Sequence, residues 1–337
     1  MGFFDFPLIF ISLPITLIIV IIIAYLIVFI IGGICYVYSF FLFKRKDWDY
    51  TGKHIFIFGG SAGVGQAIAL RLAKKGVHLS IASRSENKLK ETQEKCLIEN
   101  SKTTCDYYIC DMGNTEDVKK ALEQAVKKYG IPSLLINSAG IAHPGFIEDM
   151  TYEQYEKDMN LNYFGCLRMM KEIKILLDSN PTIERIDIVC IGSCLGLIGS
   201  IGYTAYCPTK FAIKGLLDSL RFEFLGTNVH LHYYAPSNMD TPGFAIENEH
   251  KPKLVASMEN NVQTVTADYA AHALLCNLDR YVITSEPDLD LLKNGPTFMS
   301  SHTIQDFLIC PLSALGTTFY RMMIEKNILK NVGHKKD

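Results

Sequence analysis

The sequence predicts an α/β protein whose core is a Rossmann-like, doubly wound parallel sheet, preceded by one transmembrane helix. Two patterns lead to this prediction. After residue 47, short apolar runs alternate with longer helical stretches, and before residue 44 the chain is almost wholly apolar. Of the 337 residues, 49% are hydrophobic and 20% are charged, which excludes a disordered protein. The formal net charge of −2 comes without a basic stripe, so we expect no nucleic-acid partner.

The N-terminal apolar segment is long enough to cross a bilayer once. Residues 6–43 contain no charged side chain, and a bilayer core needs about 20 helical residues. Because Pro7 and Pro14 disfavour a helix interior, we expect the span near residues 15–37. A cleaved secretory signal would begin with basic residues and have a shorter apolar run, so we expect the anchor to be retained.

The charges that flank this segment predict its orientation. No Lys or Arg precedes it, whereas residues 44–46 are all basic, and positive charge tends to stay on the cytoplasmic side. The ten cysteines show no paired metal-ligand spacing, so we expect free cytosolic thiols and no metal site. We therefore divide the chain into a membrane anchor at 1–46, a globular domain at 47–285 that faces the cytosol, and a C-terminal extension at 286–337.

Seven short apolar runs predict the strands of the sheet, at 54–58, 77–82, 106–110, 133–137, 186–191, 229–233 and 280–284. Helical stretches are expected at 64–75, 115–129, 152–178 and 206–224. Strands that alternate with helices in this way are typical of a parallel sheet covered on both faces. In the C-terminal extension, residues 307–320 are uncharged but too few to span a bilayer. They leave an interfacial helix and a helix packed on the domain as alternatives.

The turn after the first predicted strand has glycines where a phosphate-binding loop needs them. Gly59, Gly63 and Gly65 lie between the strand at 54–58 and the following helix. Glycine permits the tight turn and the close approach of a phosphate, to which the helix N-terminus offers free N–H groups. A tight turn without a ligand would explain the same residues, but its position at the first strand–helix junction favours a dinucleotide site.

The end of the second predicted strand indicates which dinucleotide is bound. Sites that prefer NAD place a carboxylate there, whereas this chain has Arg84, with Lys88 one helical turn later. Two cations suit the 2′-phosphate of NADPH, so we expect NADPH as the cofactor. A solvated arginine in a loop is the alternative.

Four residues further along the chain form a candidate catalytic group. Tyr206 and Lys210 are four residues apart and so lie on one face of a predicted helix, whereas the nearby Tyr203 lacks such a lysine. Ser193 follows the fifth predicted strand, at the sheet edge where ligands bind, and Asn162 lies in the helix before that strand. Ketone reduction puts negative charge on oxygen and needs a proton donor. We expect Lys210 to lower the pKa of Tyr206, the donor, and Ser193 to hydrogen-bond the substrate oxygen.

The glycine spacing and the order Asn162, Ser193, Tyr206, Lys210 resemble the short-chain dehydrogenase/reductase family. The family commonly has threonine where this chain has Phe58, so one side-chain hydrogen bond is lost. The resemblance implies that Asn162 holds a water through which Lys210 exchanges protons with solvent. It also implies that the cofactor is held by Gly59, Ser61, Ala62, Gly63, Gly65, Arg84, Lys88, Asp111, Asn137, Tyr206, Lys210 and Thr241.

A narrower resemblance comes from residues 240–252, whose Asp-Thr-Pro-Gly-Phe-Ala beginning is similar to that of 3-ketodihydrosphingosine reductases. It implies a reductase of the endoplasmic-reticulum membrane that uses NADPH and Tyr206 to convert 3-ketosphinganine, a long-chain lipid ketone, to sphinganine in sphingolipid biosynthesis. The alternatives are an anchored reductase of a 3-ketoacyl thioester, steroid or retinoid, and a catalytically inactive scaffold. Substrate chain length, homo-oligomer formation, a retention signal and membrane insertion of residues 304–320 stay open.

Overall fold

The computed structural model describes residues 48–180, 184–259 and 262–285, together with ten helical positions between Ile19 and Ile34. The C-terminal extension at 286–337 and most of the predicted anchor therefore lie outside the described residues. Among the residues that are described, no helix is both long enough and apolar enough to cross a bilayer.

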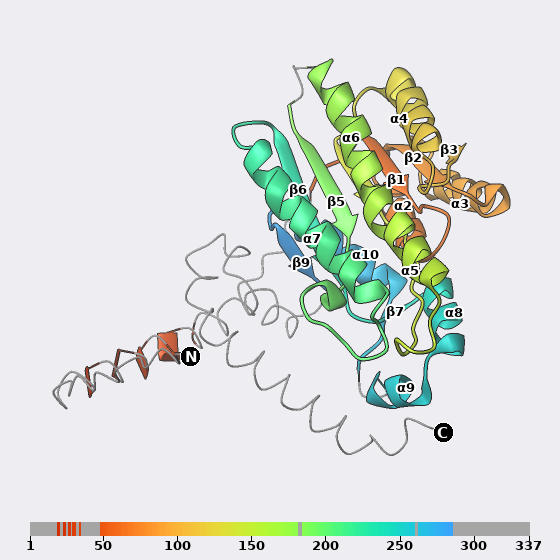
Figure 1. Cartoon of the computed structure of the whole chain (residues 1–337). Helices are drawn as coiled ribbons and strands as arrows, with labels where there is room; N and C mark the ends of the chain where they lie inside the picture. Colours follow the sequence, from red (N-terminus) through yellow and green to blue (C-terminus); the bar gives the residue numbers. More distant parts are fainter. Residues whose placement is uncertain are drawn as a thin grey trace, which may run out of the picture.

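Seven parallel strands form one sheet in the order β3-β2-β1-β4-β5-β6-β9 (Figure 1). They are β1 (His54–Phe58), β2 (His78–Ser83), β3 (Thr104–Ile109), β4 (Leu134–Asn137), β5 (Ile186–Ile191), β6 (Val229–Ala235) and β9 (Val282–Thr284). Each corresponds to a predicted strand, with ends that differ by at most two residues. The predicted doubly wound parallel sheet is confirmed. Its strand order reverses between β1 and β4, and open sheets of this kind bind ligands at the carboxyl ends of the strands beside that point.

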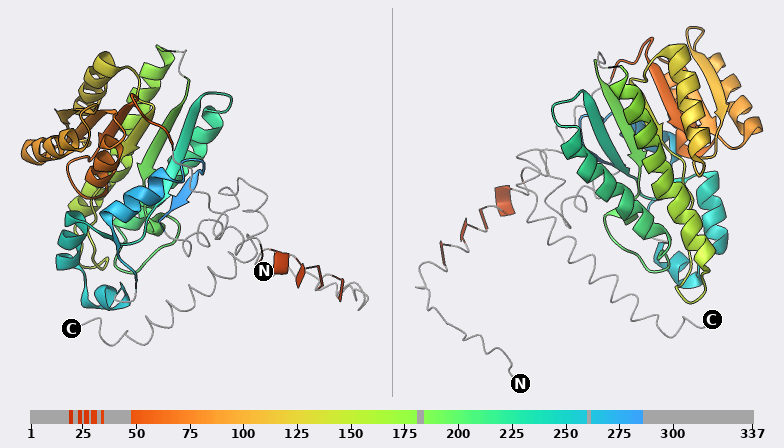
Figure 2. Two further views of the ribbon diagram at one scale, coloured as in Figure 1. Left: turned by 180° about the vertical axis from the view of Figure 1, so that it is seen from behind. Right: turned by 45° about the horizontal axis from the view of Figure 1, so that its top comes forward.

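Helices cover both faces of the sheet (Figure 2). One face packs against α2 (Gly63–Ala73), α3 (Glu86–Glu99) and α10 (Ala267–Leu275), and the other against α4 (Thr115–Tyr129), α6 (Gly165–Asp178) and α7 (Tyr206–Glu223). Successive side chains of a strand point to opposite faces of the sheet. Ile55 and Ile57 therefore pack beneath α2, α3 and α10, whereas Phe56 and Phe58 pack beneath α4, α6 and α7. Burial on both faces explains why every residue of β1 is buried.

Helix α3 and the segments between β6 and β9 are absent from the sequence-based prediction. Only Leu89, Thr92 and Cys96 of α3 are buried, so its apolar periodicity is weak. Between β6 and β9 the structure has α8 (Pro242–His250), α9 (Lys253–Glu259), α10, and a small parallel sheet of β7 (Met239–Asp240) and β8 (Val265–Thr266).

The predicted helix at 152–178 is not continuous, and this prediction was wrong. It is divided into α5 (Tyr152–Asp158), a π-helical segment η1 (Met159–Phe164) and α6. The wider π-turn lets the side chain of Asn162 leave the helix and hydrogen-bond the chain that follows β4. Such π-turns inside helices are frequent at functional sites.

Candidate active site

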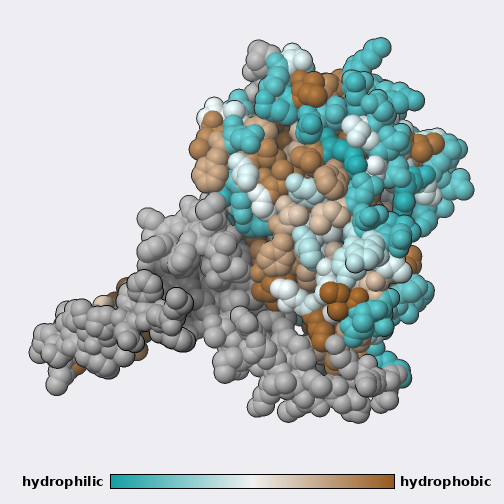
Figure 3. Space-filling view, viewed as in Figure 1, coloured by the Kyte–Doolittle hydropathy of each residue, from teal (hydrophilic) through white to brown (hydrophobic). Residues whose placement is uncertain are grey.

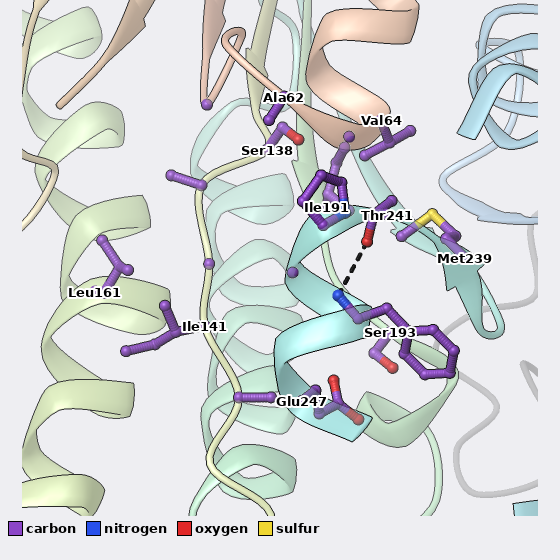
Figure 4. Close-up of a pocket in the computed structure, with 18 of the residues that line it drawn as sticks. Ala62, Val64, Ser138, Ile141, Leu161, Ile191, Ser193, Met239, Thr241 and Glu247 are labelled. Carbon is purple, nitrogen blue, oxygen red and sulfur yellow. Dashed lines mark hydrogen bonds between the residues drawn. The ribbon is translucent and has the colours of Figure 1, made fainter. Parts of the chain in front are cut away.

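A cavity of about 450 Å³ lies at the carboxyl ends of the strands, where the strand order reverses (Figure 4). The predicted site residues that line it are Gly59, Ser61, Ala62, Gly63, Arg84, Lys88, Asp111, Ser193, Tyr206, Lys210 and Thr241. These residues come from the loops after β1, β2, β3, β5 and β7 and from the first turns of α2, α3 and α7. Parallel strands end at the same edge of the sheet, which is why residues so distant in sequence meet there.

The loop between β1 and α2 has the shape of a phosphate cradle. Gly59 has a φ of +75°, and its N–H donates to the carbonyl of Ala82 at 2.7 Å. A Cβ on Gly59 would lie 2.7 Å from the backbone nitrogen of Ala139, and one on Gly65 would overlap the Gly59 carbonyl. Among the described residues, nothing caps the start of α2 through a side chain, and its first turn has no acidic residue. The start of α2 therefore offers uncapped N–H groups that suit the pyrophosphate of a dinucleotide.

Arg84 and Lys88 lie at the corner between β2 and α3, and both line the cavity and are exposed. Neither forms an ion pair with an acidic side chain that the structure describes. The acidic residue closest in sequence, Glu86, is held by Lys90 at 2.9 Å and by the hydroxyl of Tyr107 at 3.1 Å. The two cations are therefore available to a phosphate at this end of the cavity.

Asp111 and Asn137 support the cavity through their turns. Asp111 lines it, and its Oδ1 accepts from the N–H of Gly113 at 2.8 Å. Asn137, at the end of β4, does not line it, because its buried side chain accepts from the N–H of Ala139 at 3.1 Å. Gly65 likewise packs behind the loop and does not line the cavity.

Thr241, in the segment after β6, packs against the loop between β1 and α2. Its Oγ1 caps α8 by accepting from the N–H of Phe244 at 3.2 Å (Figure 4). A Cβ on Gly63 would lie 3.2 Å from Cγ2 of Thr241, so the two residues face each other across the entrance of α2.

Ser193, Tyr206 and Lys210 meet at the other end of the cavity. Ser193 follows β5, and its Oγ accepts from the N–H of Leu195 at 3.1 Å. Tyr206 and Lys210 come from the start of α7, with the lysine Nζ 5.3 Å from the centroid of the tyrosine ring. The ammonium also donates to the carbonyl of Ile191 at 3.0 Å. The hydroxyl groups of Ser193 and Tyr206, beside the ammonium of Lys210, can hold a carbonyl oxygen and supply a proton to it.

The electrostatics of Tyr206 differ from the sequence-based expectation. Its pKa is raised well above the ordinary value, first by desolvation and then by the negative charge of Glu247, while a hydrogen bond with Ser193 acts in the opposite direction. Burial lowers the pKa of Lys210 to about 8, so its own charge is weakly held. The expected lowering of the Tyr206 pKa is therefore not found, because burial raises that pKa. A raised pKa keeps Tyr206 protonated at neutral pH, as a proton donor must be.

Asn162 lies behind the catalytic residues and does not line the cavity. It is fully buried in η1, where its Oδ1 accepts from the N–H of Ile141 and its Nδ2 donates to Thr209, at 2.9 and 3.0 Å. A Cβ on Gly140 would lie 3.2 Å from this Oδ1 and 3.6 Å from Nζ of Lys210. Asn162 and Lys210 therefore approach the same glycine, which makes Asn162 a positioning residue.

Tyr233 of β6 organises this end of the cavity and was missed from the sequence. Its buried hydroxyl lies 3.2 Å from the backbone nitrogen of Ser193 and 3.3 Å from the carbonyl of Lys210. A Cβ on Gly192 or Gly196 would overlap the tyrosine. Two glycines so close to Ser193 indicate that a bulky group packs there, but nothing in the sequence shows that this group is Tyr233.

Glu247 of α8 is a second cavity residue that sequence reasoning missed. Its Oε1 lies 2.6 Å from the hydroxyl of Tyr203, and Oε1 of Glu259 lies 2.7 Å from the same hydroxyl. Tyr203, which sequence reasoning set aside as a proton donor, thus bridges two carboxylates. Desolvation and these two charges raise its pKa.

The chain belongs to the short-chain dehydrogenase family. Residues 53–252 match the family described as short chain dehydrogenase, and the cavity unites the glycine loop with Ser193, Tyr206 and Lys210. The protein is therefore an oxidoreductase of this family, as the resemblance predicted.

Its relatives include several sphingoid-base reductases. The 3-ketodihydrosphingosine reductase of Dictyostelium discoideum is 33% identical over 70% of this chain and 74% of that protein. The 3-dehydrosphinganine reductase of Danio rerio is 32% identical over 63% of this chain and 64% of its own length. A 3-ketodihydrosphingosine reductase of Cryptococcus neoformans is 28% identical over 89% of this chain and 91% of that protein.

Solved structures share the fold at lower identity. Levodione reductase is 20% identical, with a TM-score of 0.63 over 70% of this chain and 96% of its own. A short chain dehydrogenase/reductase from Burkholderia phymatum, solved in complex with NAD, is 21% identical, with a TM-score of 0.63 over 71% and 91% of the two chains.

Proposed function

We propose that this protein reduces 3-ketosphinganine to sphinganine with NADPH, as a step of sphingolipid biosynthesis. One observation carries the proposal: Ser193, Tyr206 and Lys210 converge in one cavity with the glycine loop, in a chain 33% identical to a 3-ketodihydrosphingosine reductase. The presence of both Tyr206 and Lys210 argues against an inactive scaffold, which has no use for this pair.

The geometry supports a reduction in which side chains of the cavity bind and protonate the ketone oxygen. When bound, the cofactor supplies a hydride to the carbonyl carbon at C3. Ser193 holds the carbonyl oxygen by a hydrogen bond, and Tyr206 donates its hydroxyl proton as negative charge develops there. Lys210, close to the tyrosine ring and buried, then returns a proton toward the phenolate. Asn162 acts by holding the chain around Ile141 in place beside Lys210.

NADPH is proposed as the cofactor because of the corner between β2 and α3. Arg84 and Lys88 line the cavity there and are exposed, and the nearby Glu86 is already paired with Lys90. A 2′-phosphate gains charge-assisted hydrogen bonds from such cations, whereas the 2′-hydroxyl of NADH would gain less.

We also propose that the enzyme works at the endoplasmic-reticulum membrane with its catalytic domain in the cytosol. The uncharged run at 6–43 and the basic residues 44–46 support this proposal. So do large apolar side chains exposed on or next to α6 and α7, namely Ile175, Phe211, Phe222 and Leu225. Apolar surface gathers over this part of the molecule in Figure 3, and a lipid ketone would reach the enzyme from such a surface.

The proposed reaction is tested by incubating purified full-length protein with NADPH and a panel of ketones. We expect oxidation of NADPH with 3-ketosphinganine in preference to a 3-ketoacyl thioester, a steroid ketone or a retinoid. Turnover of only a non-sphingoid ketone would show that the substrate is wrong.

Tyr206→Phe tests the proton donor in the same assay. Loss of a general acid should lower kcat by roughly 10²–10⁴-fold, while NADPH binding, followed by fluorescence, stays near that of the wild type. Tyr152→Phe is the matched control, because Tyr152 is 87% exposed and does not line the cavity. Retained turnover in Tyr206→Phe would show that another group donates the proton.

A further inference from the structure

We infer that Glu247 recognises the protonated amine of the substrate and so makes the enzyme selective for amino ketones. The inference rests on the proposed function, and it names the feature by which the site would distinguish a sphingoid ketone from other long-chain ketones. No sequence motif led to it, since Glu247 joins the cavity only through the fold.

Glu247 reaches the catalytic end of the cavity from α8. It lines the same cavity as Ser193 and Tyr206, and Figure 4 draws its carboxylate at the same end as Ser193. Its charge acts on Tyr206 strongly enough to be the second cause of the raised pKa of that residue. A carboxylate at this end of the cavity could contact a cation carried beside a carbonyl that Ser193 and Tyr206 hold.

The partners of Glu247 leave it incompletely neutralised. Lys251 lies 3.1 Å from Oε1 of Glu247 but 2.6 Å from Oε2 of Glu259, and it also donates to Asn248 at 2.7 Å. The lysine side chain is only 2% exposed, so it is fixed between the two acids. Tyr203 has one proton for two carboxylates. Two acidic groups thus share one cation and one hydroxyl proton.

One oxygen of Glu247 remains for a ligand. Tyr203 and Lys251 both contact Oε1, and Oε2 has no hydrogen-bond partner among the residues that the structure describes. Other charges inside the cavity have separate places: Arg84 and Lys88 lie at the corner after β2, and Lys210 donates to the carbonyl of Ile191. An ammonium bound at Glu247 would balance the excess negative charge of this end.

The chemistry of a 3-ketosphingoid base matches this arrangement. Its amine is on the carbon bonded directly to the carbonyl carbon, so it lies beside the oxygen that Ser193 and Tyr206 would hold. A 3-ketoacyl thioester, a steroid ketone and a retinoid have no cation there. Binding of the ammonium would also offset the charge of Glu247 that raises the pKa of Tyr206, which makes proton donation easier when the correct substrate is present.

The test compares two ketones of equal chain length, 3-ketosphinganine and 1-hydroxyoctadecan-3-one, which lacks the amine. We expect wild-type protein to have a kcat/KM at least about tenfold higher for the amino ketone, as a charged hydrogen bond provides. Glu247→Gln should remove most of this preference, lowering the ratio of the two kcat/KM values by roughly tenfold to a hundredfold. Because the substitution also removes a charge that raises the pKa of Tyr206, kcat/KM for the ketone that lacks the amine should rise rather than fall. Glu247→Asp keeps the charge and should keep the preference.

Glu249→Gln is the matched control, since Glu249 is an exposed carboxylate on the same helix α8 that does not line the cavity. It should preserve the preference, and NADPH binding and thermal unfolding report whether each variant is folded. Equal kcat/KM values of the wild type for the two ketones would overturn this inference without any variant. So would a preference that survives in Glu247→Gln. Wild-type protein that reduces neither ketone would instead overturn the proposed function itself.

Discussion

Lys210 is the residue at which burial and charge compete most directly. Its side chain is buried beneath Tyr206, and desolvation lowers its pKa to about 8, although nearby acidic groups that include Asp158 oppose the shift. A lysine with a lowered pKa is protonated below that value and neutral above it. Ketone reduction consumes a proton, so the protonated lysine is the form that favours the reaction.

The pH dependence of kcat/KM should report this group. We expect kcat/KM for ketone reduction to fall as the pH rises through about 8, because Lys210 loses its proton there. Asp158→Asn removes a negative charge that raises the pKa of Lys210, so the midpoint should move to lower pH. Asp149→Asn, at an exposed carboxylate, is the control and should leave it in place. A midpoint that stays or rises in Asp158→Asn contradicts this account.

The residues of the site were predictable to different degrees. Tyr206 and Lys210 are four apart on one helix, so local geometry alone places them together. Tyr233 and Glu247 were not predictable, because their contacts with Ser193 and Tyr203 join segments about forty residues apart. The upward shift of the Tyr206 pKa could not be predicted from the sequence either, since desolvation depends on how the surrounding residues pack.

At the scale of the elements, the proposed preference for NADPH depends on the corner between β2 and α3. Strand β2 was predicted, but α3 was not, since only three of its residues are buried. The helix nevertheless matters, because Lys88 lies in its first turn and lines the cavity together with Arg84 of the preceding loop.

Arg84→Asp should reverse the cofactor preference. Replacing the cation by an anion removes a charge-assisted hydrogen bond to the 2′-phosphate and adds repulsion, so we expect NADPH binding to weaken roughly a hundredfold. Binding of NADH should change little. Lys95→Asp makes the same charge change on the exposed face of α3, away from the cavity, and should affect neither dinucleotide. The measurement is fluorescence titration, and equal weakening for both dinucleotides would argue against a 2′-phosphate site.

At the scale of the whole molecule, the cavity and the exposed apolar surface occupy different parts of the described domain. The cavity lies at the carboxyl edge of the strands, while the apolar surface of α6 and α7 lies on one face (Figure 3). The proposed anchor at 1–46 precedes β1 by only a few residues, so the catalytic domain would be held close to the bilayer.

The proposed topology predicts that protease added to intact microsomes digests the catalytic domain. Positive charge at residues 44–46 should keep the following chain on the cytosolic side. Loss of a C-terminal tag on immunoblots, with a lumenal protein protected until detergent is added, would be the expected result. A tagged domain that survives without detergent would place it in the lumen.

The sequence by itself determined the strand pattern, the glycine loop and the Tyr206–Lys210 pair, because each depends on residues that are neighbours along the chain. Only the tertiary structure decided that Tyr233 supports Ser193, that the helix around Asn162 opens into a π-turn, and that Glu247 turns a carboxylate into the cavity. Such contacts depend on how separate elements pack, and packing is set by burial and close approach rather than by local periodicity.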